Sequence, residues 1–427
     1  MSIGVAGQTI PKWLFFPRCL DSEAAWSLNS KLLSCGFSMA WSQMIIRLRL
    51  KIFRATCALT IFALFSPYCY AEGLKSLWQK KLDSKTLGAP YESVIPPSIW
   101  ALAFSPDGKT LAAGVGIIKS KQPPYDGYKS YVALVSIVNP DSPPRKFEVS
   151  TKPWMNQPRI TWSADGRYLA IDQLNLDEDA RVLDTETARE YVVARTKCMV
   201  IGIVPGPQLL MGDFFVERVI RLVNLNGSIE QEWAMPSNVA NAGFAVMAGW
   251  LALARGDPKA SGINTFHEFA LVRYDDHSDI ARWPFAGSWG FSGAISTSGS
   301  VFCSQFYDPQ SYSSRKVTCW EVPAFQEIGS VPIRLGSRSS SKMMVGGTSR
   351  IAVEEGSSVP GSRSVWDVRA GLRLAHWSVP VQKVLPKSSW PAEYLWSKVV
   401  YPYALSPDGN TVAEGGEGVI TLYGLPH

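Results

Sequence analysis

The sequence predicts an all-β protein built from a repeated antiparallel unit. An apolar run, a tight polar turn and a second apolar run recur along the chain, at separations of 40 to 62 residues. Two β runs joined in this way form a hairpin, and periods near 50 residues are typical of four-stranded β-propeller blades. The composition, 46% hydrophobic and 18% charged, supplies a large core and excludes intrinsic disorder. We therefore expect a seven-bladed β-propeller over residues 72–427.

The turns carry the clearest signal. Three copies have the pattern Ser-Pro/Ala-Asp-Gly, in which proline presets φ, aspartate supports the turn and glycine takes the position with positive φ. The predicted structural turns are therefore those of Asp107 and Gly108, Asp165 and Gly166, and Asp408 and Gly409.

Four weaker copies bring the number of repeats to seven. Their turn glycines are Gly206, Gly249, Gly299 and Gly347. Six or eight blades would follow if one weak copy is misread. The last repeat ends with Val419–Tyr423 and lacks an outer strand, whereas the strand-like segment Leu74–Leu82 precedes the first repeat. Pairing of these two segments would close the ring and remove two open sheet edges.

Later strands of the repeats end in polar corners, and one of them carries Trp366-Asp367 followed by Gly371. Together with the Ser-Pro-Asp-Gly turns, this pair resembles the WD40-type β-propeller repeat. The resemblance covers most of residues 75–425, although most copies lack the Trp-Asp and Gly-His pairs. It implies a looser WD40-like propeller, as in exported bacterial proteins.

The segment from Met44 has the features of a secretory signal peptide. Four cations precede the apolar run Ala55–Phe65, Pro67 ends that run, and Cys69-Tyr70-Ala71 has small residues at a cleavage site. We expect cleavage between Ala71 and Glu72. The apolar run is shorter than the ~20 residues of a membrane-spanning helix; an uncleaved membrane anchor is the alternative.

The position of the signal bears on the start of translation and on charge. A signal peptide at 44–71 makes residues 1–43 an over-extended start or a disordered N-terminal segment, with Met1, Met39 and Met44 as candidate initiators.

The exported chain carries 35 Lys+Arg and 34 Asp+Glu. A near-neutral surface argues against nucleic acid as a partner. We expect a periplasmic or extracellular monomer with no stable membrane span after signal removal.

Three cysteines follow the predicted cleavage point. Cys303 and Cys319 should lie on adjacent strands and face one another, so that a disulfide in an oxidising compartment and two separate buried thiols are both open. Cys198 is expected to be a small core residue.

No group of residues predicts catalysis, a cofactor or a metal. The acidic groups Asp172 with Asp177-Glu178-Asp179, and Asp275-Asp276-His277 with His267, fit solvated turns better than calcium or acid–base sites. The chain has four histidines and lacks a Gly-x-Ser-x-Gly motif and a phosphate-binding loop.

The sequence therefore favours a non-enzymatic protein-binding or scaffold propeller of the bacterial cell envelope. Partner contacts are expected at long loops, which are Lys119–Lys129, Ala260–Thr265, Phe306–Ser314 and Val379–Ser397. The alternative is a propeller enzyme or a small-ligand or sugar-binding protein with a site at the channel mouth. Sugar stacking would use Trp154, Trp289, Trp390 and Trp396. The largely apolar first strands of the repeats argue against a channel site.

Overall fold

A computed structural model describes most of residues 74–426. The gaps are residues 91, 93–96, 119–127, 150–158, 173–178, 195–197, 205, 214–218, 235–238, 241–249, 257–264, 274, 277, 289–291, 308–314, 323, 334–342, 348, 356–361 and 379–400. The chain divides into two compact units, Met1–Tyr68 and Cys69–His427, and every described residue belongs to the second. The predictions for Met1, Met39, Met44, Ala71 and Glu72 therefore lie outside the described residues.

Within the described part of the chain, the strands form seven four-stranded sheets, each with antiparallel pairing of neighbours. We number the sheets along the chain. Sheet 1 contains β2 (Ser98–Phe104), β3 (Thr110–Ile118), β4 (Tyr128–Ser136) and β5 (Arg145–Val149). Sheet 2 contains β6 (Arg159–Trp162), β7 (Tyr168–Asp172), β8 (Ala180–Asp184) and β9 (Arg189–Val193). Sheet 3 contains β10 (Met199–Val204), β11 (Gln208–Asp213), β12 (Val219–Asn224) and β13 (Ile229–Ala234).

The remaining sheets follow the same order. Sheet 4 contains β14 (Val239–Ala240), β15 (Trp250–Gly256), β16 (Thr265–Arg273) and β17 (Asp279–Ser288). Sheet 5 contains β18 (Ser292–Ile295), β19 (Val301–Tyr307), β20 (Arg315–Glu321) and β21 (Gln326–Pro332). Sheet 6 contains β22 (Met343–Val345), β23 (Arg350–Glu355), β24 (Ser362–Asp367) and β25 (Leu372–Ser378). Sheet 7 contains β26 (Tyr403–Leu405), β27 (Thr411–Gly416), β28 (Val419–Gly424) and, at its edge, β1 (Lys75–Lys81).

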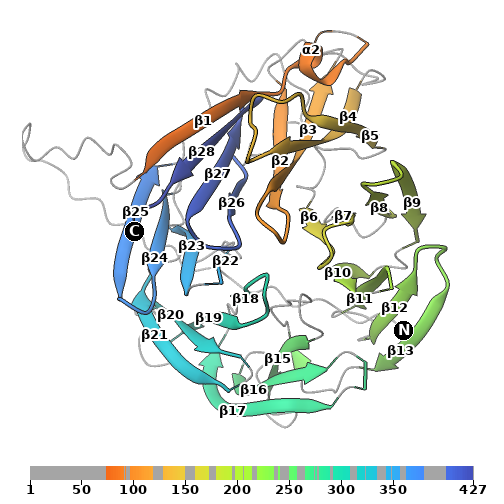
Figure 1. Ribbon diagram of the computed structural model, residues 1–427. Coiled ribbons are helices and arrows are strands. Elements are labelled where there is room, and N and C mark those ends of the chain that lie inside the picture. Colours follow the sequence, from red (N-terminus) through yellow and green to blue (C-terminus); the bar gives the residue numbers. More distant parts are fainter. Residues whose placement is uncertain are drawn as a thin grey trace, which may run out of the picture. The chain divides into compact units, whose positions relative to one another are not determined.

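The sheets stand around a common centre in chain order, which is the arrangement of a β-propeller (Figure 1). The first strand of a sheet commonly lies against the first strand of the next sheet: β2 contacts β6, β18 contacts β22, and β22 contacts β26. Sheet 7 also contacts sheet 1, because β26 and β27 both lie against β2. The prediction of an all-β propeller is thus correct.

Antiparallel order gives each sheet two different ends. The turn joining the first and second strands and the turn joining the third and fourth strands leave from the same end. We call this end of the sheets the turn face; the connections between second and third strands leave from the other end. Most of the long loops singled out in the sequence connect second to third strands, and they lie largely outside the described residues.

The prediction that the turn glycines take positive φ is confirmed at most of the described positions. Positive φ occurs at Gly108 (71°), Gly166 (74°), Gly299 (72°) and Gly409 (72°), and also at Gly206. The assignment of Gly347 is wrong: the β22–β23 turn places its positive φ on Ser349 (71°) instead. That turn is shorter by one residue, since Val345 pairs with Ile351 whereas Phe104 pairs with Leu111.

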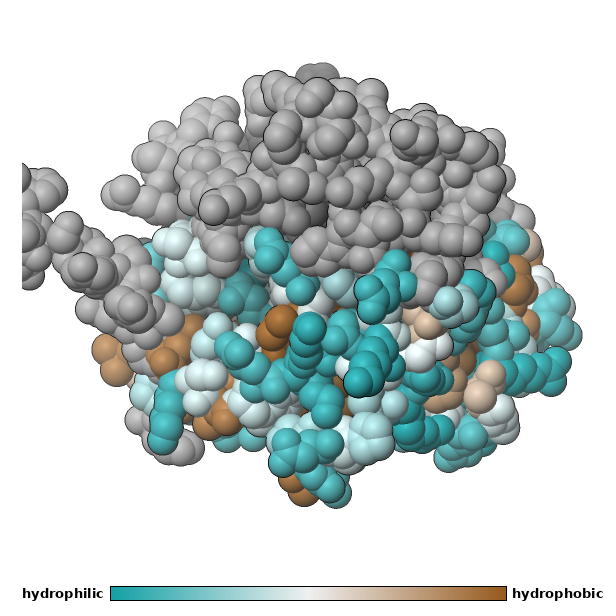
Figure 2. Space-filling view, turned by 90° about the horizontal axis from the view of Figure 1, so that it is seen from above, coloured by the Kyte–Doolittle hydropathy of each residue, from teal (hydrophilic) through white to brown (hydrophobic). Residues whose placement is uncertain are grey.

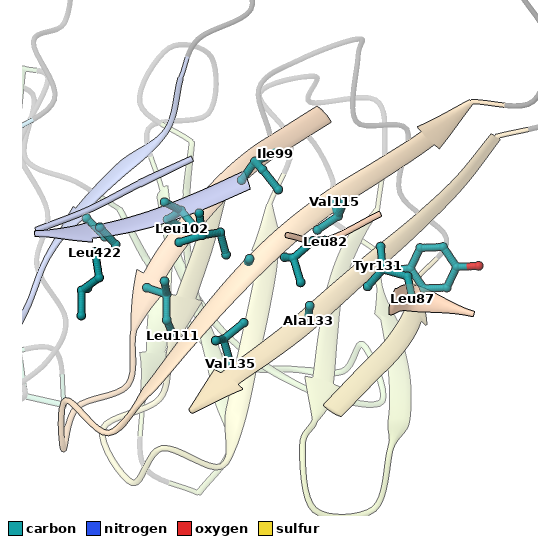
Figure 3. Close-up of a cluster of buried hydrophobic side chains, with 14 of the residues drawn as sticks. Leu82, Leu87, Ile99, Leu102, Leu111, Val115, Tyr131, Ala133, Val135 and Leu422 are labelled. Carbon is teal, nitrogen blue, oxygen red and sulfur yellow. The ribbon is translucent and has the colours of Figure 1, made fainter. Parts of the chain in front are cut away.

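Apolar side chains fill the seams between neighbouring sheets. The cluster in Figure 3 joins sheet 7 to sheet 1, with Leu422 from β28 and Leu102, Leu111 and Val135 from sheet 1. A second cluster joins sheet 1 to sheet 2 through Trp100, Phe147 and Ile160. Sheet 1 thus buries one face against sheet 7 and the other against sheet 2, so burial between sheets supplies this part of the core.

The segment between β1 and β2 adds two residues to the first of these clusters. Leu82 and Leu87 are fully buried there and Trp78 packs against them. The backbone N–H of Leu82 donates to the Gly418 carbonyl at 2.6 Å. Between the two leucines lies the short helix α2 (Ser84–Leu87), capped by Asp83 and ended by Gly88 in the left-handed conformation.

β1 itself completes sheet 7. It pairs antiparallel with β28, and Gln79 lies opposite Thr421. A bulge between Ser76 and Trp78 interrupts the register and leaves Leu77 close to Gly424. The predicted pairing of the N-terminal segment with the last strand is therefore present in the structure.

Candidate interaction surface

In the turns between first and second strands, side chains form hydrogen bonds with the turn backbone and hold its conformation. In sheet 1 the Asp107 carboxylate accepts from the Ser105 hydroxyl at 2.6 Å and from the Lys109 N–H at 3.0 Å. The Ser105 hydroxyl also accepts from the Thr110 N–H at 3.0 Å. These hydrogen bonds, that from Ser105 first, lower the pKa of Asp107 from its ordinary value. The carboxylate therefore stabilises the turn while ionised.

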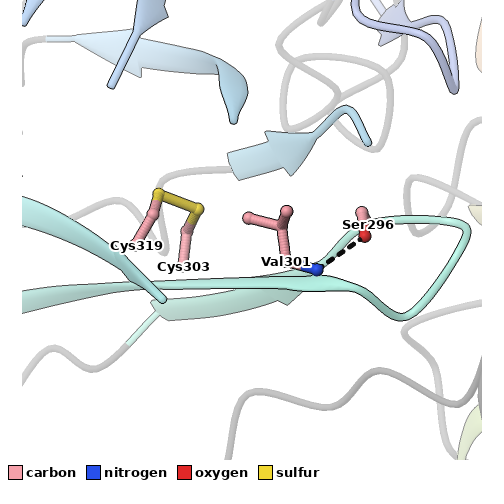
Figure 4. The surroundings of a disulfide bond; sticks show 4 residues. All are labelled: Ser296, Val301, Cys303 and Cys319. Carbon is pink, nitrogen blue, oxygen red and sulfur yellow. Dashed lines mark hydrogen bonds between the residues drawn. A yellow bond between two sulfur atoms is a disulfide. The ribbon is translucent and has the colours of Figure 1, made fainter. Parts of the chain in front are cut away.

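The same network recurs in two other sheets. Asp165 accepts from the Ser163 hydroxyl and the Arg167 N–H, and Asp408 accepts from the Ser406 hydroxyl and the Asn410 N–H. In sheet 5 the Ser296 hydroxyl accepts from the Val301 N–H at 3.0 Å, with Ser298 in place of the aspartate (Figure 4). The predicted turn aspartates therefore stabilise their turns.

These turns contact one another from sheet to sheet. A Cβ placed on Gly166 would lie 3.7 Å from the ring of Pro106, and one on Gly108 would lie 3.7 Å from the ring of Pro407. On the other side, the Gly347 N–H donates to the Pro407 carbonyl at 2.7 Å. The chain of contacts thus runs from sheet 6 through sheets 7 and 1 to sheet 2.

A buried ion pair fixes sheet 6 against sheet 7. The Arg363 guanidinium, 1% exposed, donates from Nη1 to Glu414 Oε1 at 2.6 Å, and from Nη2 to the Tyr401 carbonyl. Trp377 Nε1 donates to the same Glu414 oxygen at 3.2 Å. The guanidinium also lies over the Tyr403 ring, 4.4 Å from its centroid.

Two strands of sheet 6 and two of sheet 7 converge on this pair, which no sequence motif predicted. Arg363 lies on β24 and Trp377 on β25, whereas Tyr403 lies on β26 and Glu414 on β27. Because a buried charge needs a partner, these two residues require one another. The pair thus joins sheet 6 to sheet 7, and the charges of Arg363 and Glu414 neutralise each other.

Other seams also carry polar contacts. Trp162 Nε1 of sheet 2 donates to the Ala103 carbonyl of sheet 1 at 3.1 Å. Arg369 of sheet 6 pairs with Glu321 of sheet 5 at 2.9 Å. Lys80 Nζ, on β1, donates to the Pro140 and Ser142 carbonyls of sheet 1 at 2.7 and 2.9 Å. Contacts of this kind set the rotation of one sheet relative to the next.

A second ion pair lies within sheet 2. The Arg167 guanidinium donates to both oxygens of the buried Asp184, at 2.7 and 3.2 Å. The N–H groups of Glu186 and Thr187 also donate to Asp184. This environment, the arginine above all, holds the pKa of Asp184 well below its usual range. This ion pair lies at the turn between the third and fourth strands of sheet 2, where the sequence analysis predicted a polar corner.

The two cysteines singled out in the sequence lie directly opposite each other. Cys303 on β19 pairs in register with Cys319 on β20, with their Cα atoms 4.0 Å apart. Both are fully buried, and their sulfurs are joined in a disulfide (Figure 4). Cys198 is a buried thiol, and Arg221 Nη1 donates to its sulfur at 3.3 Å.

The other candidate residues do not come together as a site. Asp172 is buried at the end of β7 and Asp179 is exposed, whereas Asp177 and Glu178 lie outside the described residues. Asp275 and Asp276 form an exposed turn after β16; His267 lies on β16, and His277 is outside the described residues. Trp154, Trp289, Trp390 and Trp396 are also outside them. Within the described part of the chain, no group of three or more acidic, His or Cys residues could hold a metal ion.

On the face shown in Figure 2, the described surface is mainly hydrophilic, with separate hydrophobic residues. Three of the most exposed hydrophobic side chains lie at or beside third-to-fourth strand turns: Val138 (76%), Leu372 (60%) and Ile229 (50%). They belong to sheets 1, 6 and 3, so these exposed apolar side chains lie on separate sheets of the turn face. None of the described helices is long and apolar enough to cross a membrane.

Comparison with known proteins supports the fold. No family model matches the chain, and no curated protein matches it. Among solved structures it resembles the β-propeller domain of Cps50 (Swd1) from Myceliophteria thermophila, with a TM-score of 0.50 and 12% identity. The match covers 83% of this chain and 100% of that domain. Since 1070 solved chains match, the likeness indicates a propeller and singles out no activity.

Proposed function

We propose that this chain is a non-enzymatic protein-binding propeller, a scaffold of the bacterial cell envelope that acts as a monomer. The observation that carries the proposal is the chain of turn contacts running from sheet 6 through sheets 7 and 1 to sheet 2. A framework held in this way presents its connecting segments in fixed positions. Propellers commonly use such segments to bind other proteins, so this part of the proposal rests on analogy of fold.

The ring in this proposal has seven blades and is closed by β1. The contacts of β26 and β27 with β2, together with the pairing of β1 and β28, support closure. Leu82 and Leu87 support it as well, because their burial in the seam of sheets 7 and 1 would be lost in an open ring. Closure also leaves no first or last sheet exposed to another chain.

The place of action is proposed from the sequence. Cations followed by an apolar run and small residues before Glu72 suggest export, with cleavage after Ala71. The opposed pair Cys303–Cys319 suits an oxidising compartment, where a disulfide persists. N-terminal sequencing of the exported protein tests this point: the proposal expects Glu72 as the first residue, and retention of residues 1–43 would contradict it.

Affinity capture from the cell envelope tests the binding role. The bait is the exported form, and the matched bait carries Val138→Asp and Leu372→Asp, two changes at exposed positions that leave the core intact. The proposal expects one protein in stoichiometric amount on the unaltered bait. Loss of that protein on the matched bait would assign the contact to the turn face, and its retention to the opposite end. Absence of a stoichiometric partner, together with turnover of a small substrate, would contradict the proposal.

A further inference from the structure

The turn between β12 and β13 contains the single Asn-Gly pair of the sequence, Asn226-Gly227. Asn226 Oδ1 accepts two hydrogen bonds, from the Ser228 N–H at 2.9 Å and from the Ser228 hydroxyl at 2.7 Å. A backbone N–H can only donate, so the accepting atom is the carbonyl oxygen of the amide. The side-chain carbonyl is thus polarised by two donors.

An Asn-Gly pair can react with itself. The Gly227 nitrogen gives up its proton to hydroxide and attacks Asn226 Cγ, forming a new C–N bond. The bond from Cγ to the side-chain nitrogen then breaks, and that nitrogen leaves with a proton from water as ammonia. Water opens the resulting succinimide at either carbonyl, leaving aspartate or isoaspartate. The reaction therefore needs water and hydroxide and no other reactant.

The geometry favours the first step. Negative charge develops on Asn226 Oδ1 as the ring forms, and the two Ser228 donors already lie at the distances that stabilise such an oxyanion. Gly227 has φ 87°, and no heavy atom lies within 4 Å of the position where its Cβ would be, so its surroundings are open. The Gly227 N–H donates to the Asn224 carbonyl at 2.9 Å, and this one bond must open for reaction.

A neighbouring turn shows that the product fits. In sheet 4 Asp276 stands two residues before Ser278, and its Oδ1 accepts from the Ser278 N–H at 2.9 Å and from the Ser278 hydroxyl at 2.6 Å. An aspartate at position 226 can keep the same two hydrogen bonds. We propose that Asn226 is a site of spontaneous deamidation, by which this turn gains one negative charge and, where the product is aspartate, keeps its structure.

Peptide mapping by mass spectrometry tests this inference, which is independent of the proposed function. The exported protein is incubated at mildly alkaline pH, folded or unfolded in urea, and the amide-to-acid mass change is followed at each asparagine. The inference expects Asn226 to convert faster than Asn224 and Asn410, and faster folded than unfolded. Ser228→Ala should slow conversion about three- to tenfold, a modest effect because water replaces the lost donor in an exposed turn.

The matched control is Ser278→Ala, which removes the corresponding donor from the sheet 4 turn and should leave the rate at Asn226 unchanged. Two results would each overturn the inference: a rate in the folded chain no greater than in the unfolded chain, or a rate insensitive to Ser228→Ala. The first would show that the turn protects the amide, and the second that the hydroxyl donor does not act on it.

Discussion

At the scale of single residues, the turn glycines show what the sequence can reveal. Gly108, Gly166 and Gly409 are recognisable because a backbone with positive φ strongly favours glycine, whatever surrounds it. Ser349 could not be found in this way, since there a serine takes positive φ in a turn one residue shorter. A local rule therefore predicts a position only when local geometry alone selects the residue.

Gly108→Ala tests the turn geometry. A Cβ at φ 71° is strained, and we expect the free energy of unfolding to fall by at least about 1 kcal/mol. Urea denaturation of the exported protein measures it. Lys109→Ala, at the exposed neighbouring position, is the control and should change it by less than about 0.5 kcal/mol. Equal effects of the two changes would show that the strain is absent.

Arg363 and Glu414 are the opposite case. Neither has a sequence signature. The two residues are 51 positions apart in the chain, and they meet only because their sheets pack together. An arginine is rarely buried without a partner, so an arginine known to be buried would imply an acidic partner. The sequence, however, does not show which arginine is buried.

Arg363→Met tests the buried pair. It leaves the Glu414 carboxylate buried with Trp377 as its remaining partner, and we expect a loss of about 3–5 kcal/mol in unfolding free energy. The double variant Arg363→Met, Glu414→Gln should recover part of this loss, because no unpaired charge remains. A double-mutant cycle in urea measures the coupling; additive losses would show that the two residues do not interact.

At the scale of elements, the sequence predicted most strands and missed α2. The strand segments predicted at Leu74–Leu82 and Val419–Tyr423 agree with β1 and β28, because apolar runs bounded by turn residues identify strands well. Four residues of helix carry no usable periodicity, and α2 depends on Asp83 and Gly88 at its two ends. The loops expected to bind partners remain predictions.

The cap of α2 makes stability depend on pH. The Thr86 N–H donates to the Asp83 carboxylate at 2.8 Å and, as the main cause, lowers the pKa of Asp83 to about 2. Because the pKa is lowered in the folded state, the ionised cap stabilises the folded protein at pH values above the ordinary pKa of 3.8. This contribution is lost as the pH falls toward 2.

Asp83→Ala should therefore cost about 1 kcal/mol of unfolding free energy at pH 7, and its effect should shrink as pH falls from 4 toward 2. Urea denaturation at several pH values measures both. A cost that stays constant down to pH 2 would show that the Asp83 carboxylate is not the cap.

The β19–β20 hairpin gives a redox test. A bond between Cys303 and Cys319 closes a loop over a sequence separation of 16, for which about 3 kcal/mol of stabilisation is expected. Reduction should therefore lower the melting temperature of the unaltered protein. The variant Cys303→Ala, Cys319→Ala should be insensitive to the reductant, and an unaltered protein equally insensitive would contradict the bond.

At the scale of the whole molecule, the seam of sheets 7 and 1 differs from the others because it is built from segments at both ends of the described chain. Trp78, Leu82 and Leu87 enter from the N-terminal side and Ile420 and Leu422 from the C-terminal side. The paired strands β1 and β28 are some 340 positions apart, so their pairing costs loop entropy, which the burial in this seam offsets.

The most direct test of the account is a cross-link between β1 and β28. Gln79 and Thr421 lie opposite each other, so Gln79→Cys with Thr421→Cys should form a disulfide within one chain under mild oxidation and raise the melting temperature. Gln79→Cys with Asn410→Cys, remote from it in the register, should not. Failure of the opposed pair to bond, or bonding only between chains, would contradict a ring closed by its own N-terminal strand.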